Sequence, residues 1–413
     1  MRRSPPPLSH GRLVVLLGAL STFGPLSMDL YLPGLPSMAT DLSAPAWAAQ
    51  LTITTCMLGL ASGQLVAGPV SDARGRRAPL LAGLTAYMVA SMLCALAPTV
   101  WALLVLRLVQ GLAGAAGIVI ARAIVRDLHS GIEAARFFAM LMLVAGLAPI
   151  LAPLVGGQLL HVTDWRGVFV VLAAIGAVLL LAAWWALADT LPVERRHSGG
   201  LVATLGVFGG LVRDRAFVGY TLAMGLSFGA MAAYISGSPF VLEDIHGVSP
   251  QLFSVLFALN AGGLLVASQV SRALVARLGP RRILGIGVSS CAAGGLGALA
   301  SVVLDLGLAG LLPSFFVLVA SIGLILPNAA ALALAEHPRT AGSASALLGV
   351  AQFGIGAIAA PLAGIAGSHS ALPLATVSAT LSCAALVCLI GLTRRAGTAA
   401  RPVSTLGAPE SPA

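Results

Sequence analysis

Long apolar runs are the feature of this sequence that most restricts its fold. Of the 413 residues, 58% are hydrophobic and only 9% are charged, which is more apolar surface than one soluble core can bury. A membrane-spanning helix uses about 20 mostly apolar residues, so this content suffices for roughly twelve spans. The composition therefore excludes an ordinary soluble enzyme, a disordered chain and a disulfide-stapled secreted domain.

The spacing of the apolar runs predicts an all-α polytopic membrane protein with twelve transmembrane helices in two six-helix halves. The first six spans are expected near residues 13–35, 47–70, 79–98, 101–122, 136–160 and 167–188. The second six are expected near residues 216–240, 251–275, 282–303, 306–334, 341–366 and 371–393. The predicted domains are an N-terminal half (1–188), a cytoplasmic linker (189–215), a C-terminal half (216–393) and a cytoplasmic tail (394–413).

The distribution of positive charge predicts the orientation of these spans. The chain has 23 basic and 14 acidic side chains, and every basic residue is arginine. The arginines lie at both termini and in the even-numbered loops, and only Arg107 and Arg166 fall clearly elsewhere. Because positive residues stay on the cytoplasmic side of a bilayer, both termini and the linker are expected on the cytoplasmic side of the inner membrane. The net charge of +9 then indicates topology rather than nucleic-acid binding.

Short segments recur at an offset of about half the chain, which indicates that the two halves are related repeats. Three pairs share this offset: Phe23-Gly24 with Phe228-Gly229, Gly75-Arg76-Arg77 with Gly279-Pro280-Arg281, and residues 152–156 with residues 360–364.

The most distinctive motif, residues 68–77, lies where the second span reaches the cytoplasm. Gly75 has the backbone freedom that a tight turn needs. Asp72, at a helix end, can accept hydrogen bonds from backbone donors or pair with neighbouring guanidinium groups. We expect such a cluster to act as a latch that holds the two halves in one conformation. Its members are Gly68, Asp72, Arg74, Gly75, Arg76 and Arg77.

Two more motifs lie inside predicted spans. The fourth span contains Arg107-Leu108-Val109-Gln110-Gly111, and the fifth contains a segment rich in glycine and proline at residues 146–157. Small residues allow helices to approach closely, and each proline opens the backbone ladder. The residues of interest in the fifth span are Gly146, Pro149, Pro153, Gly156 and Gly157.

These motifs resemble those of the major facilitator superfamily. Residues 68–77 are similar to its loop signature G-x-L-a-D-r-x-G-r-r, with Ala73 in place of the usual basic residue, and residues 107–111 match its R-x-x-Q-G pattern. Residues 146–157 look like the signature of its proton-driven exporters. Further segments are similar to the Bcr/CflA group of drug:proton antiporters: residues 24–33, 237–241, 247–250, 257–260, 326–329 and 342–347. The resemblance implies the major facilitator fold and drug export.

Asp29 is the candidate proton-coupling residue, with Arg107 as its expected partner. A charge inside a span costs at least about 2.5–3.5 kcal/mol, so Asp29 needs a functional reason. At 1.5 Å per residue, Asp29 lies about 6 Å and Arg107 about 9 Å below the outer boundary of the bilayer. The two side chains can meet at these depths. The resemblance implies that spans one and four line a central cavity.

Polar or adaptable residues in spans that can face such a cavity are candidates for substrate binding. They are Tyr31, Gln110, Phe228, Met231, Tyr234, Asn260, Asn328 and Gln352. The five cysteines form no C-x-x-C pair and the histidines do not cluster, so no cofactor or metal is expected. The expected partners are a small drug-like molecule, protons and the lipid bilayer, with no nucleic acid, and the protein is expected to be a monomer.

The sequence thus predicts a proton-driven multidrug efflux antiporter that works by alternating access. One alternative is a proton-coupled exporter or importer of a small metabolite on the same fold. An integral membrane enzyme would need a catalytic constellation in a sizeable loop. Because no sizeable loop of the sequence carries an HExxH, GxSxG or phosphate-cradling motif, we do not expect an enzyme.

Overall fold

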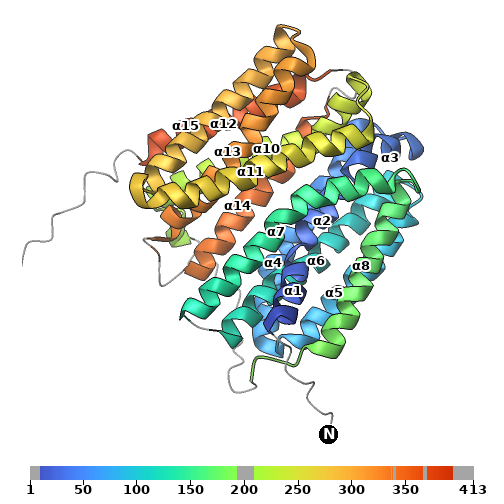
Figure 1. Cartoon of the computed structure of the whole chain (residues 1–413), viewed down its shortest axis with the longest axis vertical. Coiled ribbons are helices and arrows are strands. Elements are labelled where there is room, and N and C mark those ends of the chain that lie inside the picture. Colours follow the sequence, from blue (N-terminus) through green and yellow to red (C-terminus); the bar gives the residue numbers. More distant parts are fainter. Residues whose placement is uncertain are drawn as a thin grey trace, which may run out of the picture.

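The computed structural model of the chain describes residues 10–129, 131–192, 209–335, 337, 341–365 and 370–393, and within these ranges it contains helices but no strand. The first half comprises α1 (His10–Ser21), α2 (Phe23–Asp29), η1 (Leu32–Gly34), α3 (Leu35–Asp41), α4 (Ala46–Arg74), α5 (Arg77–Ala95), α6 (Val100–Leu128), α7 (Gly131–Leu159) and α8 (Trp165–Ala186). The second half comprises α10 (Arg215–Pro239), η3 (Phe240–Ile245), α11 (Pro250–Leu278), α12 (Pro280–Val303), α13 (Gly307–Ala335), α14 (Ala341–Leu362) and α15 (Leu372–Thr393). The blue-to-green helices form one lobe in Figure 1, and the yellow-to-red helices form the other.

The helices are long and apolar enough to cross a membrane, which confirms the predicted all-α polytopic fold for the described residues. Nine of them have the length and hydropathy of a membrane-spanning helix, or ten if the bent pair of helices in the first span counts as one span. Helices α7 and α14 contribute shorter apolar segments, Gly146–Leu159 and Leu347–Leu362. Length and hydropathy therefore establish nine to ten spans, and a total of twelve is consistent with this fold. Most of the predicted linker and the whole tail lie outside the described residues.

Capping residues set several helix ends. The Asp214 carboxylate accepts from the backbone N–H groups of the first turn of α10, and the Ser249 hydroxyl does the same for α11. Helices α4 and α11 end at Gly75 and Gly279, whose φ angles are +87° and +76°. Glycine takes up such a left-handed backbone conformation without steric cost, so the chain can turn directly into the next span after each of these helices.

The same contact occurs at equivalent places in the two halves, as expected for related repeats. Arg77 at the start of α5 donates through Nη2 to the carbonyl oxygen of Trp184 at 2.8 Å, near the end of α8. Arg281 at the start of α12 donates to the carbonyl oxygen of Thr393 at the end of α15. Each arginine therefore ties the third span of its half to the sixth.

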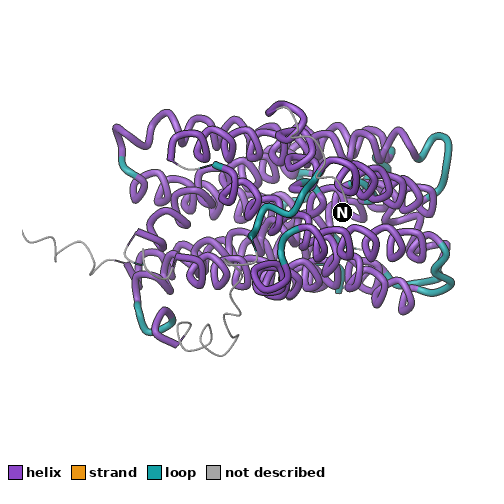
Figure 2. Tube along the Cα trace, turned by 90° about the horizontal axis from the view of Figure 1, so that it is seen from below, coloured by secondary structure: helices purple, strands orange, loops and turns teal. Residues whose placement is uncertain are grey.

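Glycines allow the closest helix contacts within the first half. A Cβ atom added to Gly59 would lie 2.2 Å from the carbonyl oxygen of Leu108, and one added to Gly111 would lie 2.2 Å from that of Cys56. Helices α4 and α6 therefore pack backbone to backbone. In Figure 2, turned by 90° from Figure 1, the described chain is almost entirely helical bundle with short connections.

Contacts between the halves run through α7 with α11 and through α4 with α14. Helices α7 and α11 lie side by side in Figure 1. These two seams place the fifth span of each half beside a span of the other half, and they frame the residues described next.

Candidate functional site

The first span breaks directly after Asp29. Proline lacks the backbone N–H and its ring clashes with the carbonyl four residues earlier, so Pro33 breaks the helix at Asp29. A short 3₁₀ turn, η1, follows. The 49° bend of the span lies earlier, at the break between Ser21 and Leu26. Asp29, which is 5% exposed, therefore lies at the end of α2 within the apolar part of the molecule. Among the described residues, no hydrogen bond or ion pair reaches its carboxylate.

Helix α7 packs against this break through Gly156. A Cβ atom on Gly156 would lie 1.9 Å from the carbonyl oxygen of Leu30, the residue after Asp29. Its neighbour Gly157 faces the other half, because a Cβ there would lie 2.2 Å from Oγ of Ser254 on α11. The glycine pair thus joins the break in the first span to the seam between the halves. Pro149 and Pro153 lie within the same helix, and Gly146 approaches the side chain of Leu265 on α11.

Arg107 is fully buried inside the first half. Its Nη1 donates to Oε1 of Gln110 at 2.6 Å, and its Nε donates to the carbonyl oxygen of Thr52 at 3.3 Å. The guanidinium lies 4.5 Å from the centre of the Tyr31 ring and 5.5 Å from that of Phe169, which favours a cation. No hydrogen-bond partner is present at Nη2, and no carboxylate of the described residues pairs with this arginine.

The expected pairing of Asp29 with Arg107 is therefore not formed in this conformation. Depth along a span estimates the level of a residue but not the direction of its side chain. Tyr31, which lies past the end of α2, is the residue over the Arg107 guanidinium. The η1 turn that follows contacts α10 and α11, so this part of the first span lies beside the other half.

Tyr234 is the centre of an aromatic cluster in the second half. Its hydroxyl accepts a hydrogen bond from Nδ2 of Asn260 at 2.7 Å. Its ring lies nearly parallel to Phe257, with 5.7 Å between centroids, and 5.1 Å from the centroid of Phe315. Two predicted substrate contacts, Tyr234 and Asn260, are therefore in direct contact with each other.

Phe228 and Met231 lie on the same helix, α10, and both are buried. The Phe228 ring packs edge-on against Phe353 at 5.5 Å. A Cβ on Gly356 of α14 would lie 3.1 Å from Phe228 and 2.7 Å from Met57 of α4, so this glycine lets both halves converge. Gln352 is partly buried and has no hydrogen-bond partner among the described residues.

Three other predicted substrate contacts join helices instead. Tyr31 shares a hydrogen bond of 2.8 Å with the hydroxyl of Thr52, and Gln110 donates to Ser91 at 2.7 Å in addition to accepting from Arg107. Asn328 on α13 donates to Oγ of Ser271 on α11 at 2.7 Å. In this conformation their polar groups are therefore used within one half.

The halves meet at the ends of helices opposite the arginine-rich loops, which we call the closed end. Here Nε2 of Gln251 donates to the carbonyl oxygen of Gly157 at 3.3 Å. The hydroxyl of Thr54 donates to the carbonyl oxygen of Ala357 at 3.1 Å. A Cβ on Gly364 would lie 2.2 Å from Oε1 of Gln50, which has no hydrogen-bond partner among the described residues. Both seams are thus tightly packed at this end.

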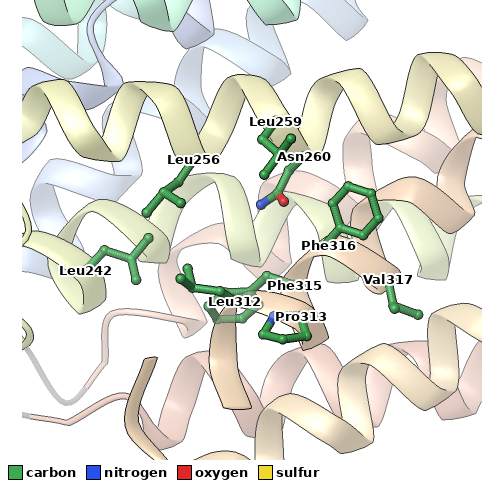
Figure 3. A pocket seen from close by; sticks show the side chains of 9 residues that line it. All are labelled: Leu242, Leu256, Leu259, Asn260, Leu312, Pro313, Phe315, Phe316 and Val317. Atoms are coloured by element: carbon green, nitrogen blue, oxygen red, sulfur yellow. The ribbon is translucent and has the colours of Figure 1, made fainter. Parts of the chain in front are cut away.

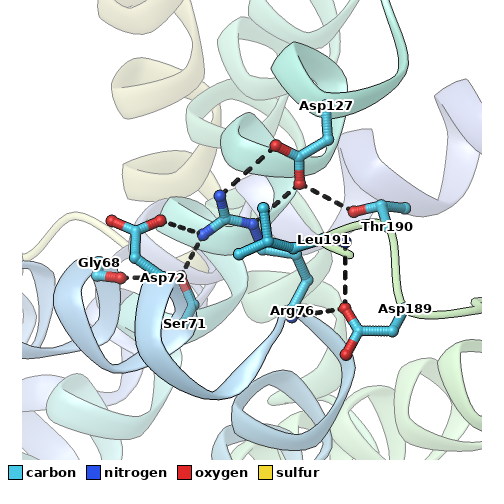
Figure 4. A network of polar contacts seen from close by, with 8 residues as sticks. All are labelled: Gly68, Ser71, Asp72, Arg76, Asp127, Asp189, Thr190 and Leu191. Atoms are coloured by element: carbon cyan, nitrogen blue, oxygen red, sulfur yellow. Dashed lines mark hydrogen bonds and ion pairs between the residues drawn. The ribbon is translucent and has the colours of Figure 1, made fainter. Parts of the chain in front are cut away.

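At the opposite end, Arg76 is the centre of the predicted latch (Figure 4). Its guanidinium donates to Asp72 and Ser71 and, through Nε, to Asp127 at 2.9 Å. Its backbone N–H donates to Asp189 at 2.9 Å. Burial lowers the pKa of Arg76, but the hydrogen bonds to Asp127 and Asp72 outweigh this effect and raise the pKa above its usual range. The guanidinium therefore stays charged.

The cluster differs from the expectation in its partners. Thr190 donates to Asp127 at 2.9 Å, so the first residues of the linker belong to it, whereas Arg74 is exposed. Gly68 accepts from Ser71 at 2.9 Å. Among the described residues, the contacts of Arg76 join α4, α6 and the start of the linker, all in or next to the first half. Asp72 is the partner of Arg76 that the motif predicted, whereas Asp127, an acid near arginines at the end of α6, was not predicted.

Comparison with known proteins gives a consistent picture. The model of the Major Facilitator Superfamily matches residues 16–361. The chain is 39% identical over 92% of its length, and 95% of the relative, to a Bacillus subtilis protein named "Uncharacterized MFS-type transporter YdgK". It is 29% identical to "Bicyclomycin resistance protein homolog" of Haemophilus influenzae, over 87% of this chain and 91% of that one. It is 32% identical to "Chloramphenicol resistance protein" of Pseudomonas aeruginosa, over 68% of this chain and 66% of that one.

Two solved structures share the fold. The nucleoside transporter NupG superposes with a TM-score of 0.72 at 15% identity, covering 92% of this chain and 98% of that one. The xylose transporter XylE of E. coli, in a partially occluded inward-open conformation, gives 0.72 at 12% identity, covering 91% and 96%. At these identities the likeness concerns the fold alone.

Proposed function

Since the chain belongs to the major facilitator superfamily, and within it to the Bcr/CflA group, we propose that it is a proton-driven antiporter that exports drug-like compounds by alternating access. It is a multi-pass membrane transporter of small molecules and not an enzyme. Relatives named for resistance to bicyclomycin, chloramphenicol and multiple drugs support the class of substrate.

The observation that carries proton coupling is the position of Asp29. It is a buried carboxylate without a hydrogen-bond or ion-pair partner among the described residues, next to the backbone contact between Leu30 and Gly156. An unpaired carboxylate in an apolar span is costly, and such residues mark ion and proton pathways. The η1 turn that follows Asp29 contacts α10 and α11 of the other half, so the protonation state of Asp29 bears on how the halves meet.

The proposed cycle uses this charge as a switch. When Asp29 is ionised, the negative charge at the end of α2 favours the conformation that binds drug from the cytoplasm. When a periplasmic proton neutralises Asp29, drug is released outside and the carrier returns with the proton. A proton can shift the conformational equilibrium only by as much as it differs in affinity for the two conformations. The change from buried charge to neutral acid supplies that difference.

In this proposal Arg107 is a positioning residue and not the ion-pair partner of Asp29. Its bonds to Thr52 and Gln110 and its contact with Tyr31 hold the region around the broken span in one arrangement. Tyr234, Asn260, Phe228, Met231 and Gln352 remain the proposed drug contacts, because they belong to helices that reach the seams. Tyr31, Gln110 and Asn328 act through the helices they join.

We also propose that the arginine-rich end is cytoplasmic, with both termini and the linker on the cytoplasmic side of the inner membrane. The closed end then faces the periplasm. The Arg76 cluster, in which Asp72 is half exposed, is then the cytoplasmic latch, and it includes the start of the linker.

Drug-susceptibility profiling tests the proposal most simply. In a bacterial strain that lacks its other exporters, expression of this gene should raise tolerance to chloramphenicol- or bicyclomycin-type compounds, and a protonophore should abolish the gain. A growth effect tied to a single nutrient, with no change in drug tolerance, would instead support a metabolite transporter on the same fold.

A further inference from the structure

The second half contains a cavity of about 460 Å³ between α11, α13 and the start of η3 (Figure 3). Leu256 and Asn260 of α11 and Leu312 and Phe316 of α13 are among the residues that line it. All of its lining residues except Asn260 are apolar. It borders the proposed drug contacts at Asn260 but includes neither Asp29 nor any residue of the Arg76 cluster.

Close packing elsewhere along the same two helices explains why the cavity exists. A Cβ on Gly323 of α13 would lie 2.2 Å from the carbonyl oxygen of Leu264 on α11, so the helices touch backbone to backbone there. A Cβ on Gly263 would lie 2.7 Å from the ring of Phe316, which therefore fills the space next to this contact. Nearer the closed end, the cavity separates α11 from α13.

The opening of the cavity faces the membrane. Its lining includes Leu259, which is 60% exposed, and Val317, which is 40% exposed. Leu259 continues an exposed apolar stripe along α11 that includes Val255 and Val266. Ser254, two residues before Leu256, packs on α7 at the seam between the halves. The exposed stripe lies about 100–140° around the helix axis from Ser254, so it does not point into that seam. Because this is a membrane transporter, lipid covers such a stripe.

The lining selects for an apolar occupant. The amide Nδ2 of Asn260 already donates to Tyr234, which leaves one amide oxygen as the polar group of the whole lining. A polar or amphipathic solute would lose its hydrogen bonds to water without replacement there. The volume is within the range of about 300–1,000 Å³ that small-molecule sites occupy. An alkyl chain fits both the chemistry and the lateral opening.

We propose that this cavity binds one acyl chain of a membrane lipid, inserted sideways between α11 and α13. The acyl chain packs against Asn260, whose amide donates to Tyr234, and against Phe315, whose ring lies 5.1 Å from that of Tyr234. The bilayer therefore reaches the aromatic cluster directly. The lipid at this site belongs to the leaflet at the closed end.

Photolabelling tests the proposal without any transport assay. The purified full-length protein is reconstituted in phosphatidylcholine that carries a diazirine at the middle of one acyl chain, and adducts are mapped by peptide mass spectrometry. Labelling at Leu256 to Asn260 and Leu312 to Val317 should exceed labelling at exposed Val266 several-fold. Leu256→Trp, or Leu312→Trp from the opposite wall, should fill the cavity and remove the excess.

Val266→Trp is the matched control, because it adds the same side chain to the lipid-facing stripe of the same helix outside the cavity, and it should leave the excess unchanged. Two results would overturn the proposal. The first is equal labelling along all exposed stripes, or labelling that neither wall variant reduces in correctly folded protein. The second is displacement of the label by chloramphenicol, which would make the occupant a transport substrate rather than a lipid.

Discussion

Gly156→Ala should be the most damaging glycine substitution in α7. The added Cβ would lie 1.9 Å from the carbonyl oxygen of Leu30 and 2.9 Å from its carbonyl carbon, both of them backbone atoms that cannot rotate away. An ordinary C···O contact is about 3.3 Å, so α7 and the break in the first span would have to separate by about 1.4 Å. Overpacking of this kind costs about 1–3 kcal/mol.

The assay compares three variants in detergent by thermal unfolding and in vesicles by drug efflux. Gly157→Ala should cost less stability, because its nearest obstacle at 2.2 Å is the hydroxyl of Ser254, a side chain that can turn. Gly262→Ala meets no atom within 4 Å and should be neutral or slightly stabilising, by up to about 1 kcal/mol from helix propensity. A Gly156→Ala protein as stable and as active as Gly262→Ala would refute the packing argument.

Three further predictions concern the latch, Arg107 and the topology. Asp127→Asn should lower the unfolding temperature more than Asp72→Asn, because the Asp127 side chain is 15% exposed and that of Asp72 is 52% exposed, and a charged hydrogen bond contributes about 1.5–3 kcal/mol. Asp72→Asn should reduce efflux far more than it reduces protein level, and equal losses of both would contradict a latch. Arg107→Lys should reduce efflux several-fold, since an ammonium cannot reach Thr52 and Gln110 together while lying over a ring; wild-type efflux would show that the fork geometry is irrelevant. In a protein without native cysteines, a membrane-impermeant maleimide added to intact cells should label His161→Cys at once but Arg213→Cys only after permeabilisation, and the reverse pattern would invert the topology.

The sequence predicts most of the fold because hydropathy acts over long segments. The second span, expected at residues 47–70, is α4 from Ala46 to Arg74, and the other straight spans agree similarly well. The first span does not, since a hydropathy average shows neither the bend between Ser21 and Leu26 nor the end of α2 at Asp29. Pro33, four residues after Asp29, was visible in the sequence, whereas the packing of α7 against Leu30 depends on the tertiary fold.

The candidate site shows where sequence reasoning ends. Depth counting brought Asp29 and Arg107 to one level, but their directions around the helix axes depend on tertiary packing. Arg107 is surrounded by Tyr31, Thr52 and Gln110, three neutral groups whose proximity no spacing rule predicts. The latch is similar, because its glycine turn follows from local sequence while the contact with Asp189 needs the folded linker.

The central claim is that titration of Asp29 couples drug export to protons. The direct measurement is uphill accumulation of chloramphenicol in inverted vesicles under an imposed pH gradient, with wild type and Asp29→Asn at matched protein levels. Asp305→Asn is the control, since Asp305 is an exposed loop carboxylate whose φ of +52° asparagine also tolerates. Asp29→Asn should still bind drug but lose accumulation and its dependence on the gradient, while Asp305→Asn behaves as wild type. Accumulation by Asp29→Asn at the wild-type rate and pH profile would contradict the account.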